Sequence, residues 1–396
     1  MFEVIVLGSS GGPFETQTQC FLVRLNNCNN NDSNNDEYIS FDGGCGLNAI
    51  AKLFTVENKT YTPEIDLYCT TTTNTSKMMD LITDKSVNVI LKSPDIKTSQ
   101  NSNILSKTLQ FYGKINKFFI THAHLDHISG FIINTPILYD QLYNDLNQHT
   151  TNMQKTLYGL ETTVRPITEN IFNCKIWPNL LAIKTNSGDA KISSEILIPG
   201  KEYVLSSSLR KNDAYSIVTL PLRHGTSITT GEIVFSSVYI LFNHLSSEML
   251  FVFGDCESDP TYLNQVWEYA TSKTSFKIKG IFIECSMPDD PSAINDPNDP
   301  NNGAELYGHM SPYYLICELE KLIRKIQSKG NTPFILNIFI THVKQNTLAM
   351  ATSNTDNYSY NPKLLILEQL KCNARKRKLD KILKFSILMN DYTYYV

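Results

Sequence analysis

Three histidines and one aspartate fall within six consecutive residues of this chain, at His122, His124, Asp126 and His127. On a strand, side chains 122 and 124 would share a face, and in a tight loop after it Asp126 and His127 can turn towards a second point nearby. Paired metal ions in hydrolases lie about 3.5–4 Å apart. Imidazole and carboxylate without thiolate suit Zn²⁺, and also Mn²⁺ or Fe²⁺. Because structural zinc sites are closed by four ligands that commonly include cysteine, the pattern indicates an open, catalytic metal site.

Five short apolar runs each end at or near a residue that could bind metal or move a proton. The runs are 117–121 before His122, 216–222 before His224, 249–253 before Asp255, 281–283 before Glu284 and 338–341 before His342. In layered α/β proteins, sites gather beyond the carboxyl ends of strands, where side chains from different strands converge. We therefore expect five buried strands whose ends meet at one site.

A histidine that stands alone in the sequence is interpreted differently from this cluster. A single histidine after a strand is more often a satisfied core or surface residue than a metal ligand, and we interpret His149 and His244 in that way. The chain has 8 histidines, and the other six lie in the motif, near strand ends or after a glycine: His122, His124, His127, His224, His309 and His342.

The elements before this cluster are predicted less completely. Residues 4–7 and 20–25 read as strands flanking the turn-rich segment Gly8–Pro13, and residues 38–41 read as a third strand that ends at Asp42. We expect Asp42 to brace the site and not to bind metal. The Asn-rich segment 26–36 is too polar to bury itself and is interpreted as a flexible hairpin tip. Helices and insertions are expected in 60–110 and 140–210.

Composition excludes several classes of protein. Of 396 residues, 41% are hydrophobic and 19% are charged, which is typical of a globular chain with a sizeable core. A net charge of −4 argues against a surface built for nucleic acid. No apolar run is long enough to span a membrane, and the N-terminus reads as a strand and not as a signal peptide. Nine scattered cysteines without a Cys-x-x-Cys pair indicate reduced thiols, so we expect a cytoplasmic protein.

The order of the potential ligands, from His122-x-His124-x-Asp126-His127 to His224, Asp255 and His342, resembles that of the metallo-β-lactamase superfamily. The resemblance implies an α+β fold, a four-layer αββα sandwich of two mixed sheets with helices outside. It implies one metal ion held by His122, His124 and His224, a second held by Asp126, His127 and His342, and Asp255 bridging both. The match runs from residue 2 to about 345, so we expect a single catalytic domain over 1–396 with insertions and a C-terminal extension at 346–396.

Finer motifs point to one branch of that superfamily. Four segments together resemble the class II cyclic-nucleotide phosphodiesterases of the fungal low-affinity type: Gly8–Pro13, Thr121–Gly130, Phe282–Ser286 and Leu306–Pro312. Glu284 and Gly308-His309 also resemble the paired Glu and His motifs of tRNase Z, which favours phosphodiester chemistry over lactam or thioester hydrolysis. The sequence departs from the pattern in the Asn-rich segment and in the long loop 287–302, which leaves the rim of the site undefined.

The resemblance implies hydrolysis of cAMP, and also of cGMP, to nucleoside 5′-monophosphates, which ends cyclic-nucleotide signalling. Two dications, expected to be Zn²⁺, would stabilise charge on the phosphate and lower the pKa of a shared water towards about 7, so that hydroxide attacks phosphorus. His309 could hydrogen-bond a phosphoryl oxygen or protonate the leaving 3′-oxygen, with Glu284 orienting its ring, and Asp126 could double as a proton acceptor. A homodimer is an expectation from the resemblance only.

Two other functions are compatible with the same fold. A tRNase Z-like RNA-processing nuclease would be expected to carry a basic arm for tRNA, and the sequence has none. A scaffold without activity would be expected to have lost ligands, and every expected ligand is present. The basic run 374–378 reads as the solvated face of a C-terminal helix, in preference to a nuclear-import signal or a site for an anionic partner.

Overall fold

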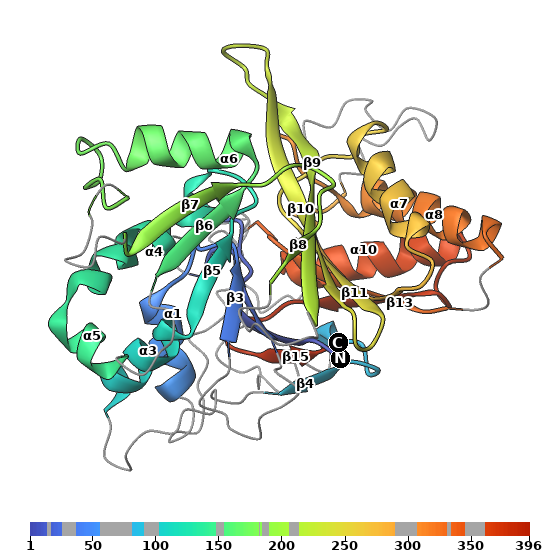
Figure 1. Cartoon of the computed structure of the whole chain (residues 1–396). Coiled ribbons are helices and arrows are strands. Elements are labelled where there is room, and N and C mark those ends of the chain that lie inside the picture. The colour runs from blue at the N-terminus through green and yellow to red at the C-terminus, as the bar shows by residue number, and fades with distance from the viewer. Residues whose placement is uncertain are drawn as a thin grey trace, which may run out of the picture.

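The computed structural model describes residues 1–13, 17–25, 37–55, 81–90, 103–147, 154–181, 183, 190–205, 214–289, 307–330, 334–344 and 361–396. Two mixed β-sheets pack face to face, and helices cover the outer face of each, so four layers follow one another across the molecule (Figure 1). This architecture confirms the αββα sandwich of the metallo-β-lactamase fold. No helix in the described ranges has the length and apolar character needed to cross a bilayer.

The first sheet has eight strands, in the order β4-β15-β1-β2-β3-β5-β6-β7. Neighbouring strands are antiparallel from β4 to β3 and parallel from β3 to β7. The strands are β4 (Asn88–Ile90), β15 (Thr393–Tyr395), β1 (Glu3–Gly8), β2 (Cys20–Leu25), β3 (Glu37–Phe41), β5 (Ile115–Phe119), β6 (Lys155–Gly159) and β7 (Ile192–Ile196).

The second sheet has seven strands, in the order β14-β13-β12-β11-β10-β9-β8. Neighbouring strands are parallel from β14 to β11 and antiparallel from β11 to β8. The strands are β14 (Leu383–Ile387), β13 (Leu336–Thr341), β12 (Lys277–Glu284), β11 (Glu248–Phe253), β10 (Ile233–Asn243), β9 (Tyr215–Thr226) and β8 (Tyr203–Val204). β9 and β10 form a long hairpin that projects beyond the sandwich (Figure 1).

Alternating side chains of the strands supply two separate apolar layers. In β1, Val4 and Val6 belong to the cluster that includes the second sheet and its helices, whereas Ile5 and Leu7 belong to the cluster that includes the helices over the first sheet. This alternation follows from the period of two residues in a strand. Because both faces are buried, the strand reads as a continuous apolar run in the sequence.

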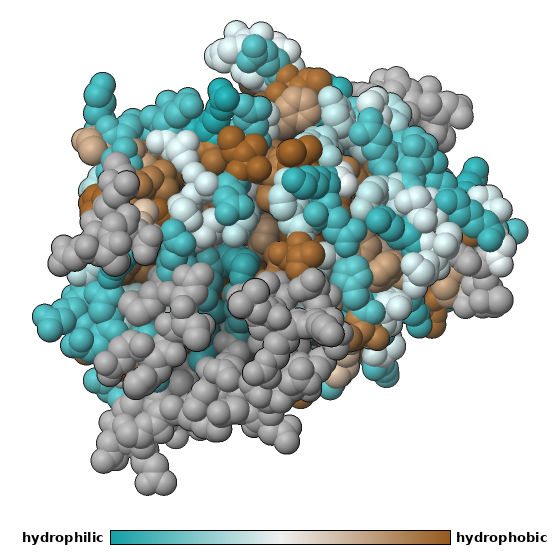
Figure 2. Space-filling model, viewed as in Figure 1, coloured by the Kyte–Doolittle hydropathy of each residue, from teal (hydrophilic) through white to brown (hydrophobic). Residues whose placement is uncertain are grey.

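The helices divide between the two outer faces (Figure 1). Those over the first sheet are α1 (Leu47–Thr55), α3 (Ile104–Gly113), α4 (Leu125–Asn134), α5 (Gln141–Leu146) and α6 (Glu161–Pro166), and those over the second are α7 (Tyr262–Ser272), α8 (Pro312–Ser328) and α10 (Pro362–Lys376). The face in Figure 2 is mainly hydrophilic, with brown patches in the region of the edge strands β7 and β8, where Ile196, Ile198 and Val204 are exposed.

Several segments differ from the sequence-based predictions or lie outside the described residues. The stretch 140–210 contains helices α5 and α6, but also strands β6, β7 and β8, which we did not predict. Residues 361–396, expected as part of a C-terminal extension, supply an edge strand to one sheet and an inner strand to the other. The Asn-rich segment 26–36 and most of the loop 287–302 lie outside the described residues.

Candidate metal centre

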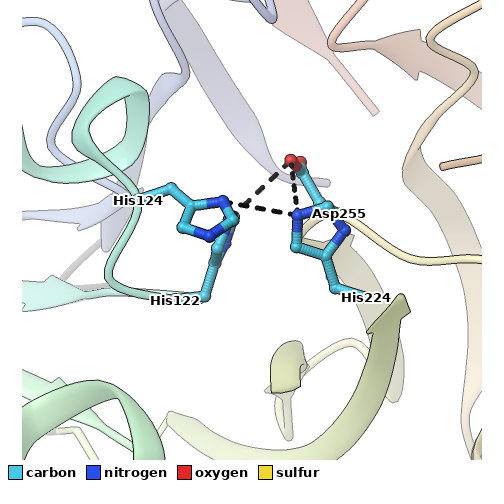
Figure 3. A group of neighbouring side chains, drawn as sticks. All are labelled: His122, His124, His224 and Asp255. Atoms are coloured by element: carbon cyan, nitrogen blue, oxygen red, sulfur yellow. Dashed lines mark hydrogen bonds and ion pairs between the residues drawn. The ribbon is translucent and has the colours of Figure 1, made fainter. Parts of the chain in front are cut away.

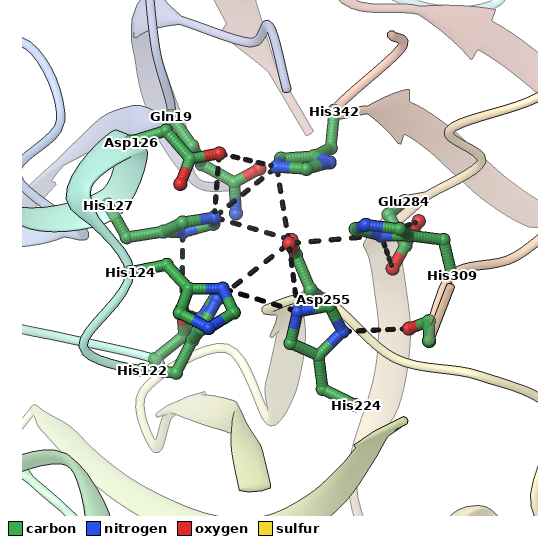
Figure 4. Close-up of polar contacts among 12 residues, drawn as sticks. Gln19, His122, His124, Asp126, His127, His224, Asp255, Glu284, His309 and His342 are labelled. Atoms are coloured by element: carbon green, nitrogen blue, oxygen red, sulfur yellow. Dashed lines mark hydrogen bonds and ion pairs between the residues drawn. The ribbon is translucent and has the colours of Figure 1, made fainter. Parts of the chain in front are cut away.

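Residues at or just beyond the ends of four strands, and a residue within a fifth strand, meet at one place in the sandwich (Figure 4). His122, Asp255 and His342 follow β5, β11 and β13, and Glu284 is the last residue of β12. His224 differs from the prediction, because β9 continues to Thr226 and the histidine lies within the strand. Asp126 and His127 also lie differently from the predicted loop, in the first turn of α4.

One group of four side chains brings three imidazoles to a carboxylate (Figure 3). Nε2 of His122 and Nε2 of His224 each lie 3.7 Å from Oδ2 of Asp255. Nδ1 of His124 lies 3.4 Å from Nε2 of His224. The four potential ligand atoms, one from each residue, lie within 4.8 Å of one another. This spacing can hold a metal ion.

A second group shares Asp255 with the first (Figure 4). Nε2 of His127 lies 3.4 Å from Oδ1 of Asp255, and Nε2 of His342 lies 3.3 Å from Oδ2. Oδ2 of Asp126 lies 3.1 Å from Nε2 of His342 and 3.6 Å from Nε2 of His127. The two groups thus unite all seven residues proposed from the sequence, with Asp255 between them.

Hydrogen bonds on the outer side of the rings fix which nitrogen faces the centre. Nδ1 of His127 lies 2.8 Å from Oδ2 of Asp42, and Nδ1 of His224 lies 2.8 Å from the carbonyl oxygen of Gly308. Since a carboxylate and a carbonyl only accept, Nδ1 carries the proton in both rings. The Nε2 lone pairs therefore point at the centre, which is the tautomer of a metal-ligating histidine.

The hydrogen bonding and the protonation of the buried side chains indicate whether this cluster can hold a divalent ion. Nε2 of His122 and Oδ1 of Asp255 are buried without a hydrogen-bond partner among the described residues. Burial lowers the pKa of His122 and His224, and it lowers the pKa of His124 to about 4, so these rings are neutral and able to coordinate. Burial alone would raise the pKa of Asp255, but the imidazoles of His342 and His127 hold it well below its usual value. Three neutral imidazoles beside an ionised carboxylate suit a divalent metal ion.

His309 and Glu284 form a hydrogen-bonded pair beside the cluster (Figure 4). Nδ1 of His309 lies 3.0 Å from Oε1 of Glu284, and both side chains are buried. The glutamate also accepts from the backbone N–H groups of Cys256, at 2.6 Å, and Met310, at 3.3 Å. Burial alone would lower the pKa of His309, but the Glu284 carboxylate raises it. With its oxygens occupied by these donors, Glu284 is placed to orient His309.

The turn Gly8–Pro13 contacts His342, a role that the sequence did not predict. The carbonyl of Ser9 accepts a hydrogen bond from the backbone N–H of His342 at 2.7 Å. A Cβ atom on Gly11 would lie 2.5 Å from the His342 ring, so only glycine allows the turn to approach. His342 itself has a φ of 57°, a conformation uncommon outside glycine. The turn therefore holds His342 in a strained position at the site.

Several residues of the site gave no signal in the sequence. Thr121 donates its N–H and hydroxyl to Asp42 at 2.8 and 2.9 Å. Gln19 donates to Asp42 at 3.1 Å and accepts from Thr341 at 3.3 Å. Asp42 contacts His127 and lies outside the metal-binding groups, as expected from the sequence. A lone Thr or Gln has no characteristic spacing, and only the strand-end position of Thr121 could have marked it.

Residues interpreted as unrelated to the site lie away from it or outside the described ranges. His244 contacts Ser216 and Glu202, at 2.7 and 3.3 Å, and His149 is not among the described residues. In the basic run, Arg375, Lys376 and Lys378 are exposed, whereas Arg377 pairs with Glu320 at 2.6 Å.

The candidate metal centre is accessible on the side of His124, which is exposed, and of Asp126, whose side chain is 28% exposed.

Comparisons with known proteins give one consistent result. Residues 35–390 match the family described as cAMP phosphodiesterases class-II. Over their full lengths, the chain is 28% identical to 3′,5′-cyclic-nucleotide phosphodiesterase 1 of Saccharomyces cerevisiae. It is 27% identical to the 3′,5′-cyclic-nucleotide phosphodiesterase of Schizosaccharomyces pombe, with 99% of this chain and 92% of the relative covered. The crystal structure of unliganded yeast PDE1 matches with a TM-score of 0.75 at 27% identity, covering 100% of this chain and 99% of that one.

Proposed function

The chain belongs to the class II family of cAMP phosphodiesterases, and we propose that it hydrolyses 3′,5′-cyclic AMP and cyclic GMP to the nucleoside 5′-monophosphates with two divalent metal ions. The observation that carries this proposal is the convergence of two potential metal-binding groups on Asp255, with the Glu284–His309 pair beside them. The family match favours this activity over RNA processing, and the complete ligand set argues against a scaffold without activity.

The chemistry of the donors suggests how the metals would be held. His122, His124 and His224 would bind one ion, Asp126, His127 and His342 the other, and Asp255 would contact both. Zn²⁺ is the ion best suited to this donor set, with Mn²⁺ or Fe²⁺ as alternatives. When bound, such ions stabilise the negative charge that builds on a phosphodiester and make water a stronger nucleophile at neutral pH.

The protein side chains would guide the protons of the reaction. Water adds to phosphorus, the bond between phosphorus and the 3′-oxygen breaks, and that oxygen takes up a proton. Nδ1 of His309 is engaged by Glu284, so Nε2 is the nitrogen available to orient a phosphoryl oxygen or to protonate the 3′-oxygen. Oδ2 of Asp126 lies 3.1 Å from Nε2 of His342, so the other carboxylate oxygen of Asp126 would accept a proton from water.

The direct test is product analysis with purified protein. We expect cAMP and cGMP to give 5′-AMP and 5′-GMP by chromatography, with no 3′-nucleotide. Precursor tRNA serves as the competing substrate, and its cleavage without hydrolysis of either cyclic nucleotide would overturn the proposal. His244→Ala is the matched control for histidine variants, because this residue follows β10 and contacts Ser216 and Glu202.

We also propose a single catalytic domain, a cytoplasmic location and a homodimer. Support for one domain comes from residues 383–395, which supply strands to both sheets. Support for a reducing compartment comes from the described cysteines, all of which are free. The homodimer rests on the resemblance alone, and light scattering on the purified protein tests it.

A further inference from the structure

Ser286 is a buried residue that contacts both the candidate metal centre and the Glu284–His309 pair. Its hydroxyl is hydrogen-bonded to Oε2 of Glu284, two residues earlier in the chain. The same oxygen lies 3.0 Å from Nδ1 of His342 and 3.4 Å from Nδ1 of His309. Ser286 is fully buried, so water does not compete for these contacts.

The direction of these hydrogen bonds follows from the chemistry of the groups. The Glu284 carboxylate only accepts, so the single hydroxyl proton of Ser286 is donated to it. Having no second proton, the Ser286 oxygen can only accept from Nδ1 of His342. His342 must then carry its proton on Nδ1, which leaves the lone pair on Nε2, the atom that faces Asp126 and Asp255.

We infer that Ser286 is a positioning residue, which fixes the tautomer of His342 and connects this ligand through Glu284 to His309. The inference rests on the proposed function, because it assigns His342 to the second metal ion. Asp42 does the same for His127, and the Gly308 carbonyl does so for His224. The group beside Nδ1 of His342 is the neutral hydroxyl of Ser286. This oxygen accepts from Nδ1 because its own proton is donated to Glu284.

The backbone of Ser286 strengthens this assignment. Its N–H donates to the carbonyl of Met310 at 3.1 Å, next to His309. Its carbonyl accepts from the N–H of Lys344 at 2.9 Å, two residues after His342. The backbone of Ser286 is thus held between the segments that carry His309 and His342, which places its hydroxyl beside both rings.

Metal titration of Ser286→Ala tests the inference by a readout other than activity. Apo-protein of the full chain is titrated with Zn²⁺ against a chromophoric chelator, and the affinity of each equivalent is determined. We expect the variant to bind its first equivalent as the wild type does, because the group of His122, His124 and His224 has no contact with Ser286. The second equivalent should bind about 10–100-fold more weakly, the usual cost of losing a group that orients a metal ligand.

The controls separate this role from a loss of stability. Ser386→Ala removes an equally buried hydroxyl, on β14, which accepts from the N–H of Asp84 at 3.0 Å, and it should bind both equivalents normally. Ser286→Thr keeps a hydroxyl and should restore the second affinity. A second equivalent bound by Ser286→Ala with wild-type affinity would overturn the inference alone. Wild-type protein that binds fewer than two equivalents would overturn the proposed two-metal function as well.

Discussion

Oδ2 of Asp42 lies 2.8 Å from Nδ1 of His127, and both side chains are buried. Asp42 has a φ of 59°, a backbone conformation that aspartate and asparagine adopt more readily than most residues. Thr121 and Gln19 donate to the same carboxylate, which keeps it aimed at the histidine. The ring of His127 is therefore oriented by a hydrogen bond on its Nδ1 side, which faces away from the candidate metal centre.

Asp42→Asn should weaken metal binding without changing the backbone. Asparagine tolerates the same φ, but its amide is neutral and presents one oxygen where two now accept. We expect the ion held by Asp126, His127 and His342 to bind about 10–100-fold more weakly in Zn²⁺ titrations. Asp140→Asn, which alters the N-cap of α5, should leave metal binding unchanged. Equal affinities for the Asp42 variant and the wild type would contradict the role.

His309→Ala should lower kcat for cAMP about 10²–10⁴-fold, the usual range for losing a general acid, while both metals and the fold are retained. Metal content by mass spectrometry and circular dichroism check the two retained properties. Near wild-type turnover of cAMP by the variant would make His309 a bystander.

A substrate with a good leaving group separates the two roles of His309. Bis(p-nitrophenyl) phosphate releases an anion that needs no proton, so the defect of His309→Ala should shrink if the residue is a general acid. If the residue orients the phosphate, the defect should stay the same as with cAMP. The ratio of kcat/KM values for wild type and variant on both substrates decides between the roles.

Variants of the proposed ligands should lose metal as well as activity. Asp255→Ala removes the carboxylate shared by the two groups, so both equivalents should be weakened, whereas His122→Ala should affect the first group only. Exhaustive chelation of the wild type should abolish activity until Zn²⁺ or Mn²⁺ is restored. Full activity after chelation would exclude the two-metal mechanism.

Lys155 should contribute more to stability as the pH rises. Its ammonium is buried and donates to the carbonyls of Tyr112 and Ile115 at 2.8 and 2.6 Å, and burial lowers its pKa from 10.5 to about 7. Between these values Lys155 holds a proton in the unfolded chain that it has lost in the folded chain, so its contribution to the free energy of unfolding increases with pH, by up to about 1.4 kcal/mol per pH unit. In urea denaturation between about pH 7 and 10, the free energy of unfolding of the wild type should rise relative to that of Lys155→Met as the pH increases. Lys85→Met, at an exposed lysine, should keep the wild-type slope.

The parts of the fold that were predictable are those whose residues are buried on both faces. Runs such as 249–253 are apolar throughout because each side of the sheet is covered, and β11 is found there. β6 and β7 were missed because they carry polar residues, including the buried Lys155 and the exposed end of β7. β14 and β15 pair with strands far away in the sequence, and no local pattern records such a partner.

The residues of the candidate site also divide into those that the sequence predicted and those that it did not. Histidines and aspartates are few, so their order and strand-end positions are visible in one sequence, and the structure brings all of the proposed residues together. The groups that orient them are ordinary residues, such as Thr121 and Ser286, or backbone carbonyls, such as that of Gly308. Their roles depend on distances between segments and become visible only in three dimensions.

The pairing of β1 with β15 bears on how the chain acquires its activity during synthesis. Glu3 pairs with Tyr395, and Phe2 and Val396 exchange backbone hydrogen bonds of 2.8 and 2.9 Å. The hydroxyl of Ser9, whose carbonyl holds His342, lies 3.0 Å from Oδ1 of Asn390. A nascent chain therefore cannot complete the support of His342 until Asn390 has been synthesised. Chains that stop before residue 393 would lack β15 and would leave the edges of β1 and β4 that face it unpaired.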